Sequence, residues 1–170
     1  RFDLSGNLYL NNTLLTSVVI PDGITNIRNN AFNGCSGLTS VTIPESVTSI
    51  GDDVFRECNS LTNMIIPESV TSIGESAFSH CSNLTNIVIP EGVMNIESYT
   101  FDGCSSLANI VFPKAMTSIG ASAFSGCSSL ISITIPVSVT RIGKDAFSGT
   151  SGLKEIHISS LEAWLDIDES

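Results

Sequence analysis

The sequence predicts an α/β solenoid, a coil of parallel strands backed by short helical turns, because three residue types recur at one fixed step. Proline, phenylalanine and cysteine each return every 23 residues along the 170-residue chain. The positions are Pro21, Pro44, Pro67, Pro90, Pro113 and Pro136; Phe32, Phe55, Phe78, Phe101, Phe124 and Phe147; and Cys35, Cys58, Cys81, Cys104 and Cys127. A period of this length is typical of a solenoid, in which each repeat is one coil that buries its apolar face against its neighbours.

The first element of each repeat is predicted to be a strand, as residues 61–66 show. Met64 and Ile66 alternate with Ile65, so the first two should point inward and Ile65 outward. Pro67 ends the strand because it has no N–H to donate to a ladder. Equivalent strands stacked in one direction and one register form a parallel sheet. Seven such segments end in residues 18–20, 41–43, 64–66, 87–89, 110–112, 133–135 and 156–158.

The second half of each repeat is predicted to turn back in a short helix. Val70 and Ile73 lie three residues apart, in an extended or turning stretch that crosses the coil. Ala77, Phe78 and Cys81 then occupy positions i, i+1 and i+4, which indicates one face of a helix. Helical turns are bulkier than strands, so we expect the stack to curve with the sheet on its concave side and the helical turns on its convex side.

The repeat Leu-x-x-Ile-x-Ile-Pro-x-x-Val-x-x-Ile-Gly-x-x-Ala-Phe-x-x-Cys-x-x-Leu resembles the BspA-like class of leucine-rich repeat over residues 14–158. The resemblance implies a right-handed leucine-rich-repeat coil from a secreted or cell-surface protein of a bacterium or mucosal protist. It also implies adhesion to host proteins or other cells, and the family has no shared catalytic residues to carry over. Thr150 and Ser159 replace the expected Cys and Pro of the last repeat, as in a terminal cap.

We expect one domain with both ends of the coil covered. Residues 1–17 predict an N-terminal β-hairpin cap, residues 18–158 a solenoid of about six repeats of 23 residues, and residues 159–170 a C-terminal capping helix or linker. Trp164 would lie over the final coil. The resemblance implies that such end segments often join consecutive arrays, so we expect the chain to be a fragment of a longer protein.

The composition argues against several kinds of partner. The chain has 17 acidic and 7 basic residues and a net charge of -10. Nucleic acid and anionic membranes are bound through clustered Lys and Arg, so we expect neither as a partner. No apolar run approaches the roughly 20 residues of a transmembrane helix, so we expect no membrane insertion in this segment. We expect a monomer that binds a protein ligand, in the host matrix or on another cell surface.

The phenylalanine and cysteine columns are interpreted as structural core. Each Phe ring should fill the space behind the sheet. Five cysteines cannot all pair internally, and one Cys per coil cannot surround a zinc ion tetrahedrally. Buried, reduced thiols that act as small hydrophobic groups are therefore favoured. Adjacent coils are nevertheless close enough for one strained disulfide.

No group of residues predicts an enzyme or a cofactor. His80 precedes Cys81, but neighbours on a helix point to different faces, so an inward Cys81 leaves His80 outward. The serines have no recognisable base beside them. We therefore expect no catalytic residues.

Carboxylates follow four of the six prolines and raise the question of a metal site. They are Asp22, Glu45, Glu68 and Glu91, followed by Lys114 and Val137 at the same position. Four carboxylates one coil apart could bind calcium, but no Asp-x-Asp loop accompanies them. A solvated column that keeps the surface soluble is favoured, and a bound metal is not expected.

The surface best suited to binding is the outward column of the strands. Its residues are Val19, Thr42, Ile65, Val88, Val111, Thr134 and His157, and Asn63, Asn86 and Asn109 lie beside the three central apolar ones. Exposed apolar patches often mark an interface. β-Branched residues are also simply good strand formers, and both interpretations stay open.

The sequence thus favours a non-catalytic extracellular module that binds a protein or surface ligand on the concave sheet. The alternative is a structural spacer that displays another domain at the cell surface. Because one repeat lattice can carry many different surfaces, the fold does not name the ligand.

Overall fold

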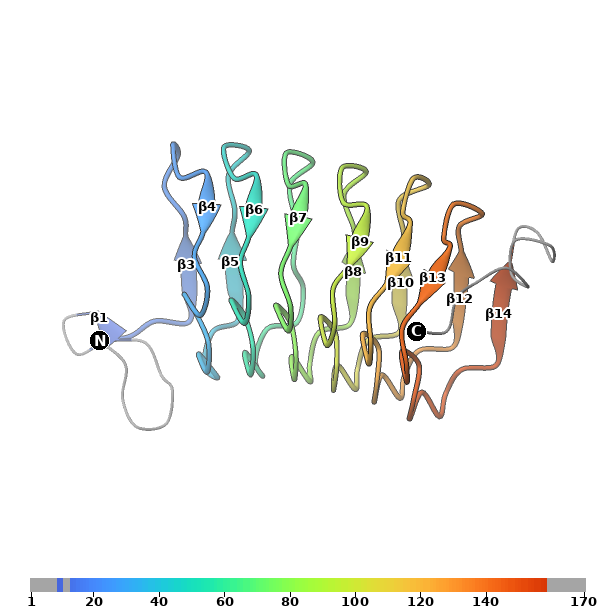
Figure 1. Cartoon of the computed structure of the whole chain (residues 1–170). Helices are drawn as coiled ribbons and strands as arrows, with labels where there is room; N and C mark the ends of the chain where they lie inside the picture. The colour runs from blue at the N-terminus through green and yellow to red at the C-terminus, as the bar shows by residue number, and fades with distance from the viewer. Residues whose placement is uncertain (1–8, 11–12, 159–170) are drawn as a thin grey trace.

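A computed structural model describes residues 9–10 and 13–158 of the chain. Residues 17–158 form a β-solenoid of six coils and a final strand. We number the coils from residue 17 in steps of 23: 17–39, 40–62, 63–85, 86–108, 109–131 and 132–154. Figure 1 shows the coils side by side along one axis, in chain order. The predicted solenoid of parallel strands is confirmed.

The strands that the sequence predicts lie along one side of the coil, which we call the strand side. They are β3 (Ser17–Val19), β5 (Ser40–Thr42), β8 (Asn86–Val88), β10 (Asn109–Val111), β12 (Ser132–Ile135) and β14 (Glu155–Ile158). The third coil contributes a single bridge between Asn63 and Asn86. Every pairing is parallel and joins residues 23 apart, such as Ile110 with Ile87.

A second set of short strands lies on the opposite side of each coil. They are β4 (Asn26–Ile27), β6 (Ser49–Ile50), β7 (Ser72–Ile73), β9 (Asn95–Ile96), β11 (Ser118–Ile119) and β13 (Arg141–Ile142). They form two parallel sheets of three strands, β4-β6-β7 and β9-β11-β13. The stretch that the sequence predicts to cross the coil is therefore a second strand ladder.

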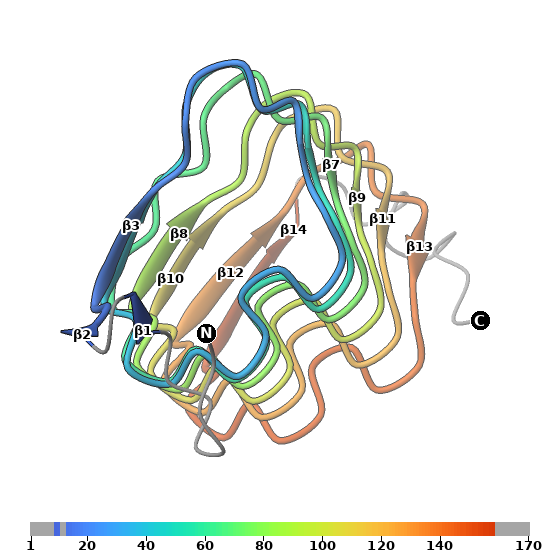
Figure 2. The same ribbon diagram turned by 90° about the vertical axis from the view of Figure 1, so that its left-hand side faces the viewer.

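The coil is right-handed. Seen from the N-terminal end, the chain rises through β3, crosses the top and descends through the second set of strands, which is clockwise as it recedes from the viewer (Figure 2). This is the hand that the family resemblance implies.

The prediction of short helices is wrong for the described residues, which contain no helix. Two positions in each turn have positive φ, for example Ser76 (56°) and His80 (59°), and a right-handed helix cannot pass through them. Alternate N–H groups also point to the next coil: Phe78 N donates to Thr100 O at 2.9 Å, whereas Ser79 N donates to Ser76 O within the turn. We call this segment, residues 76–81 and its equivalents, the Phe turn.

Left-handed residues recur in two columns of the Phe turn. The first column holds Asn30, Asp53, Ser76, Tyr99, Ser122 and Asp145, and the second holds Gly34, Glu57, His80, Gly103, Gly126 and Gly149. Asn, Asp and Gly are the residues that tolerate this conformation best. The Phe turn therefore has its own sequence signature, distinct from that of a helix.

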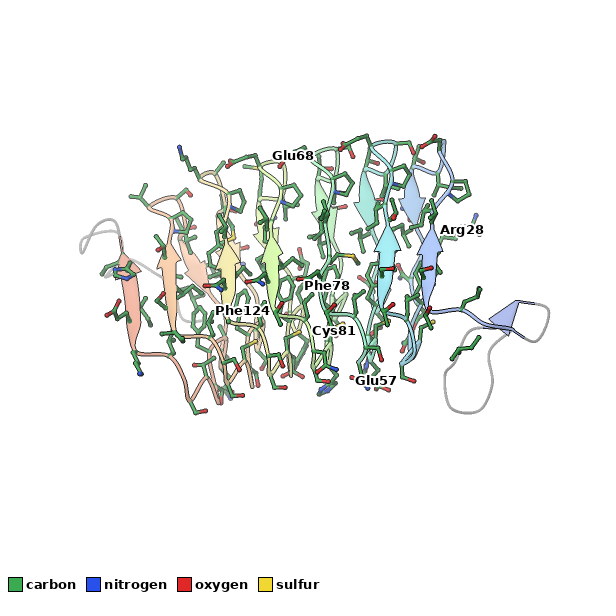
Figure 3. All side chains as sticks on the ribbon, turned by 180° about the vertical axis from the view of Figure 1, so that it is seen from behind. Arg28, Glu57, Glu68, Phe78, Cys81 and Phe124 are labelled. Atoms are coloured by element: carbon green, nitrogen blue, oxygen red, sulfur yellow. The ribbon has the colours of Figure 1, made fainter. Side chains whose placement is uncertain are left out.

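The core is a set of stacked columns inside the coil. Phe55, Phe78, Phe101 and Phe124 are fully buried, and their rings lie 5.4 Å apart in nearly parallel planes. Phe32 and Phe147 extend the stack at each end and are partly buried. Figure 3 shows Phe78, Cys81 and Phe124 inside the coil, with Glu57 and Glu68 at opposite edges.

The curvature of the array is visible along its axis. The turns that follow the prolines spread apart more widely than the Phe turns at the opposite edge, so the array fans out toward the proline side (Figure 1). The predicted bulky helices are absent from the described coils, which removes the reason for expecting the strand side to be concave. The concave strand side therefore stays a prediction.

Near the N-terminus, β1 (Tyr9–Leu10) and β2 (Thr13–Leu14) form a two-stranded antiparallel hairpin. They fall within the predicted cap of residues 1–17. The predicted C-terminal helix of residues 159–170, with Trp164, lies outside the described residues.

Candidate binding surface

The strand side presents its outward residues to solvent in a single column. Ile65 is 84% exposed, Val88 and Val111 are each 57% exposed, and Val19 is 72% exposed. Thr42, Thr134 and His157 are exposed as well. The residues between them, such as Val41 and Ile87, are buried, so the two-residue period of a strand separates surface from core. Ile65, Val88 and Val111 occupy three consecutive coils, and we call them the apolar stripe.

Hydrogen bonds link the three asparagines beside the stripe, either directly or through Thr85. Asn109 Nδ2 donates to Asn86 Oδ1 at 3.0 Å, and Asn86 Nδ2 donates to Thr85 Oγ1 at 3.1 Å. The Thr85 hydroxyl lies 3.4 Å from Asn63 Oδ1. All three asparagines are exposed. The result is an ordered polar edge, fixed along the stripe, that leaves amide groups able to bond a partner.

The cysteines lie in a column beside the phenylalanine rings, and all five are buried free thiols. Four of the thiols make equivalent hydrogen bonds, in which each Sγ donates to the backbone carbonyl of the Phe that lies 26 residues earlier in the chain. Cys81, for example, donates to Phe55 O at 3.0 Å. Burial raises the pKa of the Cys81 and Cys127 thiols to about 12, and desolvation likewise raises the pKa of Cys104. These thiols are poor nucleophiles because the thiolate is the reactive form.

His80 and Cys81 point in different directions. The Cys81 thiol bonds a backbone carbonyl inside the coil, whereas the His80 side chain is 51% exposed. The imidazole packs over Gly103, and its Nε2 lies 3.7 Å from Asp102 Oδ2. The structure therefore does not bring the two side chains together as a nucleophile and base.

The acidic column lies at the turns that follow the prolines. Within it, the Glu68 carboxylate accepts a hydrogen bond from Glu91 N at 3.3 Å. Across the described ranges 9–10 and 13–158, no three His, Cys, Asp or Glu side chains cluster as metal ligands would. In the same part of the chain, no helix has the length and apolar character to cross a bilayer.

The coil, its parallel ladders and its outward stripe define a repeat protein of the solenoid class. The family model described as "BspA type Leucine rich repeat region (6 copies)" matches residues 4–128 and 83–165. The chain belongs to this family of BspA-type leucine-rich repeats. The resemblance predicted from the Pro, Phe and Cys lattice is thus confirmed.

Three solved structures are similar to the chain. A leucine-rich repeat protein from Eubacterium ventriosum has a TM-score of 0.76 and 25% identity, covering 89% of this chain and 42% of its own. The leucine-rich repeat protein of T. pallidum has a TM-score of 0.56 and 24% identity, and the match covers 85% of this chain and 71% of the T. pallidum chain. A leucine-rich cell-surface protein from Faecalibacterium prausnitzii has a TM-score of 0.43 and 27% identity, and the match covers 92% of this chain and 63% of the Faecalibacterium chain.

No curated protein shows significant sequence similarity to the chain. The chain spans less than two thirds of the Eubacterium and Faecalibacterium proteins.

Proposed function

We propose that this chain is a non-catalytic binding module that recognises a protein ligand with its strand side. The observation that carries the proposal is the apolar stripe, because Ile65, Val88 and Val111 each expose more than half of their surface on three consecutive coils. A contiguous exposed apolar patch with polar groups along its edge is typical of a protein interface. A solenoid extends such a surface simply by repetition, since each coil adds one residue to it.

The proposed location is the cell surface or the extracellular space, which membership of the BspA-type family supports. Buried thiols that form no disulfide keep the fold independent of an oxidising environment, so the fold suits either side of a membrane. Fractionation of the producing cells, with detection by an antibody raised against residues 13–158, tests the location. A purely cytoplasmic signal would contradict it.

The binding proposal is tested by placing charge on the stripe. Ile65→Asp combined with Val88→Asp should abolish binding to whichever member of a panel of purified matrix and mucosal proteins the natural chain binds. The matched control is Thr71→Asp with Met94→Asp, which puts the same two charges one coil apart on exposed residues next to the second strand ladder. The control should bind normally. Equal binding by both double variants would move the interface away from the stripe.

The second candidate function is a rigid spacer. It is favoured by the unbroken backbone ladder of the Phe turns, which links every described coil to the next. A spacer has no ligand of its own, so no protein of the panel would bind the natural chain above background. Small-angle scattering should then show the same overall dimensions for the natural chain and for both double variants.

A further inference from the structure

The strand side is interrupted between coils 5 and 6. β10 pairs with β8 and β12 pairs with β14, but among the described residues no strand pairing joins β10 to β12. Ala108 N donates to Thr85 O at 3.0 Å and Lys154 N donates to Ile131 O at 2.8 Å, and the equivalent bond from Ile131 to Ala108 is missing from this described region. The Phe turns of the same two coils stay bonded, with Phe124 N donating to Ala146 O at 2.8 Å.

A cleft of about 420 Å³ opens at this interruption. It is lined by Ile110, Val111, Phe112, Lys114, Thr134, Pro136 and Val137. Phe112 stands where coils 2, 3, 4 and 6 have the isoleucines Ile43, Ile66, Ile89 and Ile135. Its partly buried ring meets Phe124 edge-on, with centroids 5.7 Å apart and planes at 62°. The larger side chain fills the space below the strands at the point where the two coils separate.

A similar interruption lies between coils 2 and 3, where β5 has no strand partner in the third coil among the described residues. Ile43 and Ile66 occupy the position of Phe112 there. The interruption between coils 5 and 6 differs because a larger side chain and an apolar cleft coincide at it, and because both coils that border it lie in the less acidic part of the chain.

The charge of the molecule changes along its axis at the start of coil 5, so that both coils that border the cleft lie in the less acidic part of the chain. Residues 17–108 contain ten acidic and two basic side chains, whereas residues 109–158 contain two acidic and four basic ones. At the edge of the cleft, Lys114 and Val137 replace the carboxylates that follow the first four prolines. Lys114 is exposed, and Val137 is 59% exposed. Lys114 is the one charged residue in the cleft lining.

We propose that the cleft between β10 and β12 binds an acidic segment of a partner protein, which inserts a large apolar side chain between Val111 and Val137 and pairs a carboxylate with Lys114. The proposal rests on the protein-binding function above and names the chemistry of one contact on the same side of the molecule. Apolar walls with one placed polar group are the usual composition of a binding pocket, and the volume lies within the range of about 300–1,000 Å³. This space accommodates an apolar side chain with some of its adjoining backbone.

The probe is a display library of random short peptides selected on the immobilised full chain. We expect selected peptides to carry Leu, Ile or Phe within two residues of Asp or Glu. A synthetic copy of a selected peptide should bind Lys114→Glu and Val137→Glu roughly 2- to 10-fold more weakly than the natural chain. Lys114→Glu turns an exposed attraction into a repulsion, and Val137→Glu puts a carboxylate where the apolar side chain of the peptide would pack. Binding should also weaken as salt is added.

The matched control is Glu68→Lys, which makes the opposite exchange at the equivalent position two coils away and should leave affinity for the peptide within about 2-fold. Melting temperatures check that the exposed substitutions preserve the fold. Selection of no peptide, selection without acidic residues, or unchanged binding by Lys114→Glu would each overturn the proposal.

The experiments distinguish a failure of the stripe proposal from a failure of the cleft proposal. The Ile65→Asp and Val88→Asp double variant should keep its affinity for the selected peptide, because neither residue lines the cleft. Loss of peptide binding in that variant, with full binding by Lys114→Glu, would place the peptide on the stripe and overturn the cleft. If the double variant still binds the matrix protein, the stripe proposal is contradicted, and the peptide result for the cleft is unaffected.

Discussion

The Phe turns and the strand side belong to the same six coils, yet their backbones are joined differently. In the Phe turns, three N–H groups per coil donate to the next coil at all five steps between described coils, as Asp53, Phe55 and Glu57 do to residues 75, 77 and 79 at 2.8–2.9 Å. The strand side forms three separate strand pairs and one isolated bridge. The Phe turns therefore join every described coil to the next, whereas the strand side does not.

This division leaves the strand side free to vary. Phe124 and its equivalents cannot change without loss of stacking, whereas the outward column accepts Val, Thr, Ile and His at successive coils. The interruption at β10 and β12 occurs where the Phe turns stay fully bonded. The Phe turns form a rigid edge that fixes the spacing between coils, and the strand side is left to carry the contacts with a partner. This arrangement suits a binding array, because its binding residues are held on a rigid support.

The largest effect should come from alkaline pH, which acts on the thiol column beside the Phe turns. Burial raises the pKa of Cys81 from 9.0 to about 12, so above about pH 9 the unfolded chain loses protons that the folded chain keeps. The free energy of unfolding should fall with rising pH by up to about 1.4 kcal/mol per pH unit for each such thiol. Below that range the thiols should add no pH dependence.

Urea unfolding between about pH 8 and pH 10 measures this slope. Cys81→Ala is the control, since removal of one thiol should make the slope shallower. An identical slope for the variant and the natural chain would contradict a role for the buried thiols.

The next largest effect should follow truncation of one ring in the middle of the stack. Phe78 is fully buried and lies 5.4 Å from both Phe55 and Phe101, so Phe78→Ala should cost about 3–5 kcal/mol in urea unfolding. Phe32→Ala is the matched variant, and it should cost less because Phe32 is only partly buried. Equal losses at both positions would show that ring burial does not set the stability.

A smaller effect should come from the backbone of the Phe turn. Gly126 has φ of +71°, and a Cβ there would meet Gly103 Cα at an ordinary 3.5 Å, so Gly126→Ala should cost about 1 kcal/mol through conformation alone. Glu57 has φ of 60° in the same column, and Glu57→Gly should be neutral or stabilising. Thermal unfolding of both variants measures the difference. The Glu57 carboxylate lies 3.6 Å from Arg56 Nε, and a destabilised Glu57→Gly would show that this contact outweighs the backbone strain.

The smallest effect should come from the apolar stripe. Ile65→Asp and Val88→Asp alter exposed side chains on the less regular side of the coil, so each should change stability by no more than about 0.5 kcal/mol. Urea unfolding of each single variant measures this. A loss comparable to that of Phe78→Ala would mean that the strand side also holds the array together.

Much of the fold could be predicted because residues 23 apart lie directly beside one another in adjacent coils. The Pro, Phe and Cys columns located the strands and the core without any structure. The helix was mispredicted because the spacing of Ala77, Phe78 and Cys81 fits both a helix and a turn with alternating backbone directions. Asn30, Asp53 and the repeated glycines were the available signal, since these residues favour positive φ.

The second strand ladder and the cleft were harder to predict. A two-residue strand such as β7 is too short to show alternation. The cleft depends on Phe112 in one coil and on the packing of its ring against Phe124, which lies 12 residues further on and in an adjoining column. A single larger residue does not reveal whether the neighbouring coils close around it or separate.

The reach of the contacts in this molecule has a consequence for its inheritance. The Cys81 thiol and the Phe78 amide each bond only an adjacent coil, as do three further thiols and four further Phe amides. Recombination that deletes one whole unit, such as residues 62–84, would join Leu61 to Thr85 and give each remaining side chain an equivalent neighbour. A gene of this kind can lengthen or shorten its product by whole 23-residue units, whereas a deletion of any length that is not a multiple of 23 would place residues of different columns beside one another.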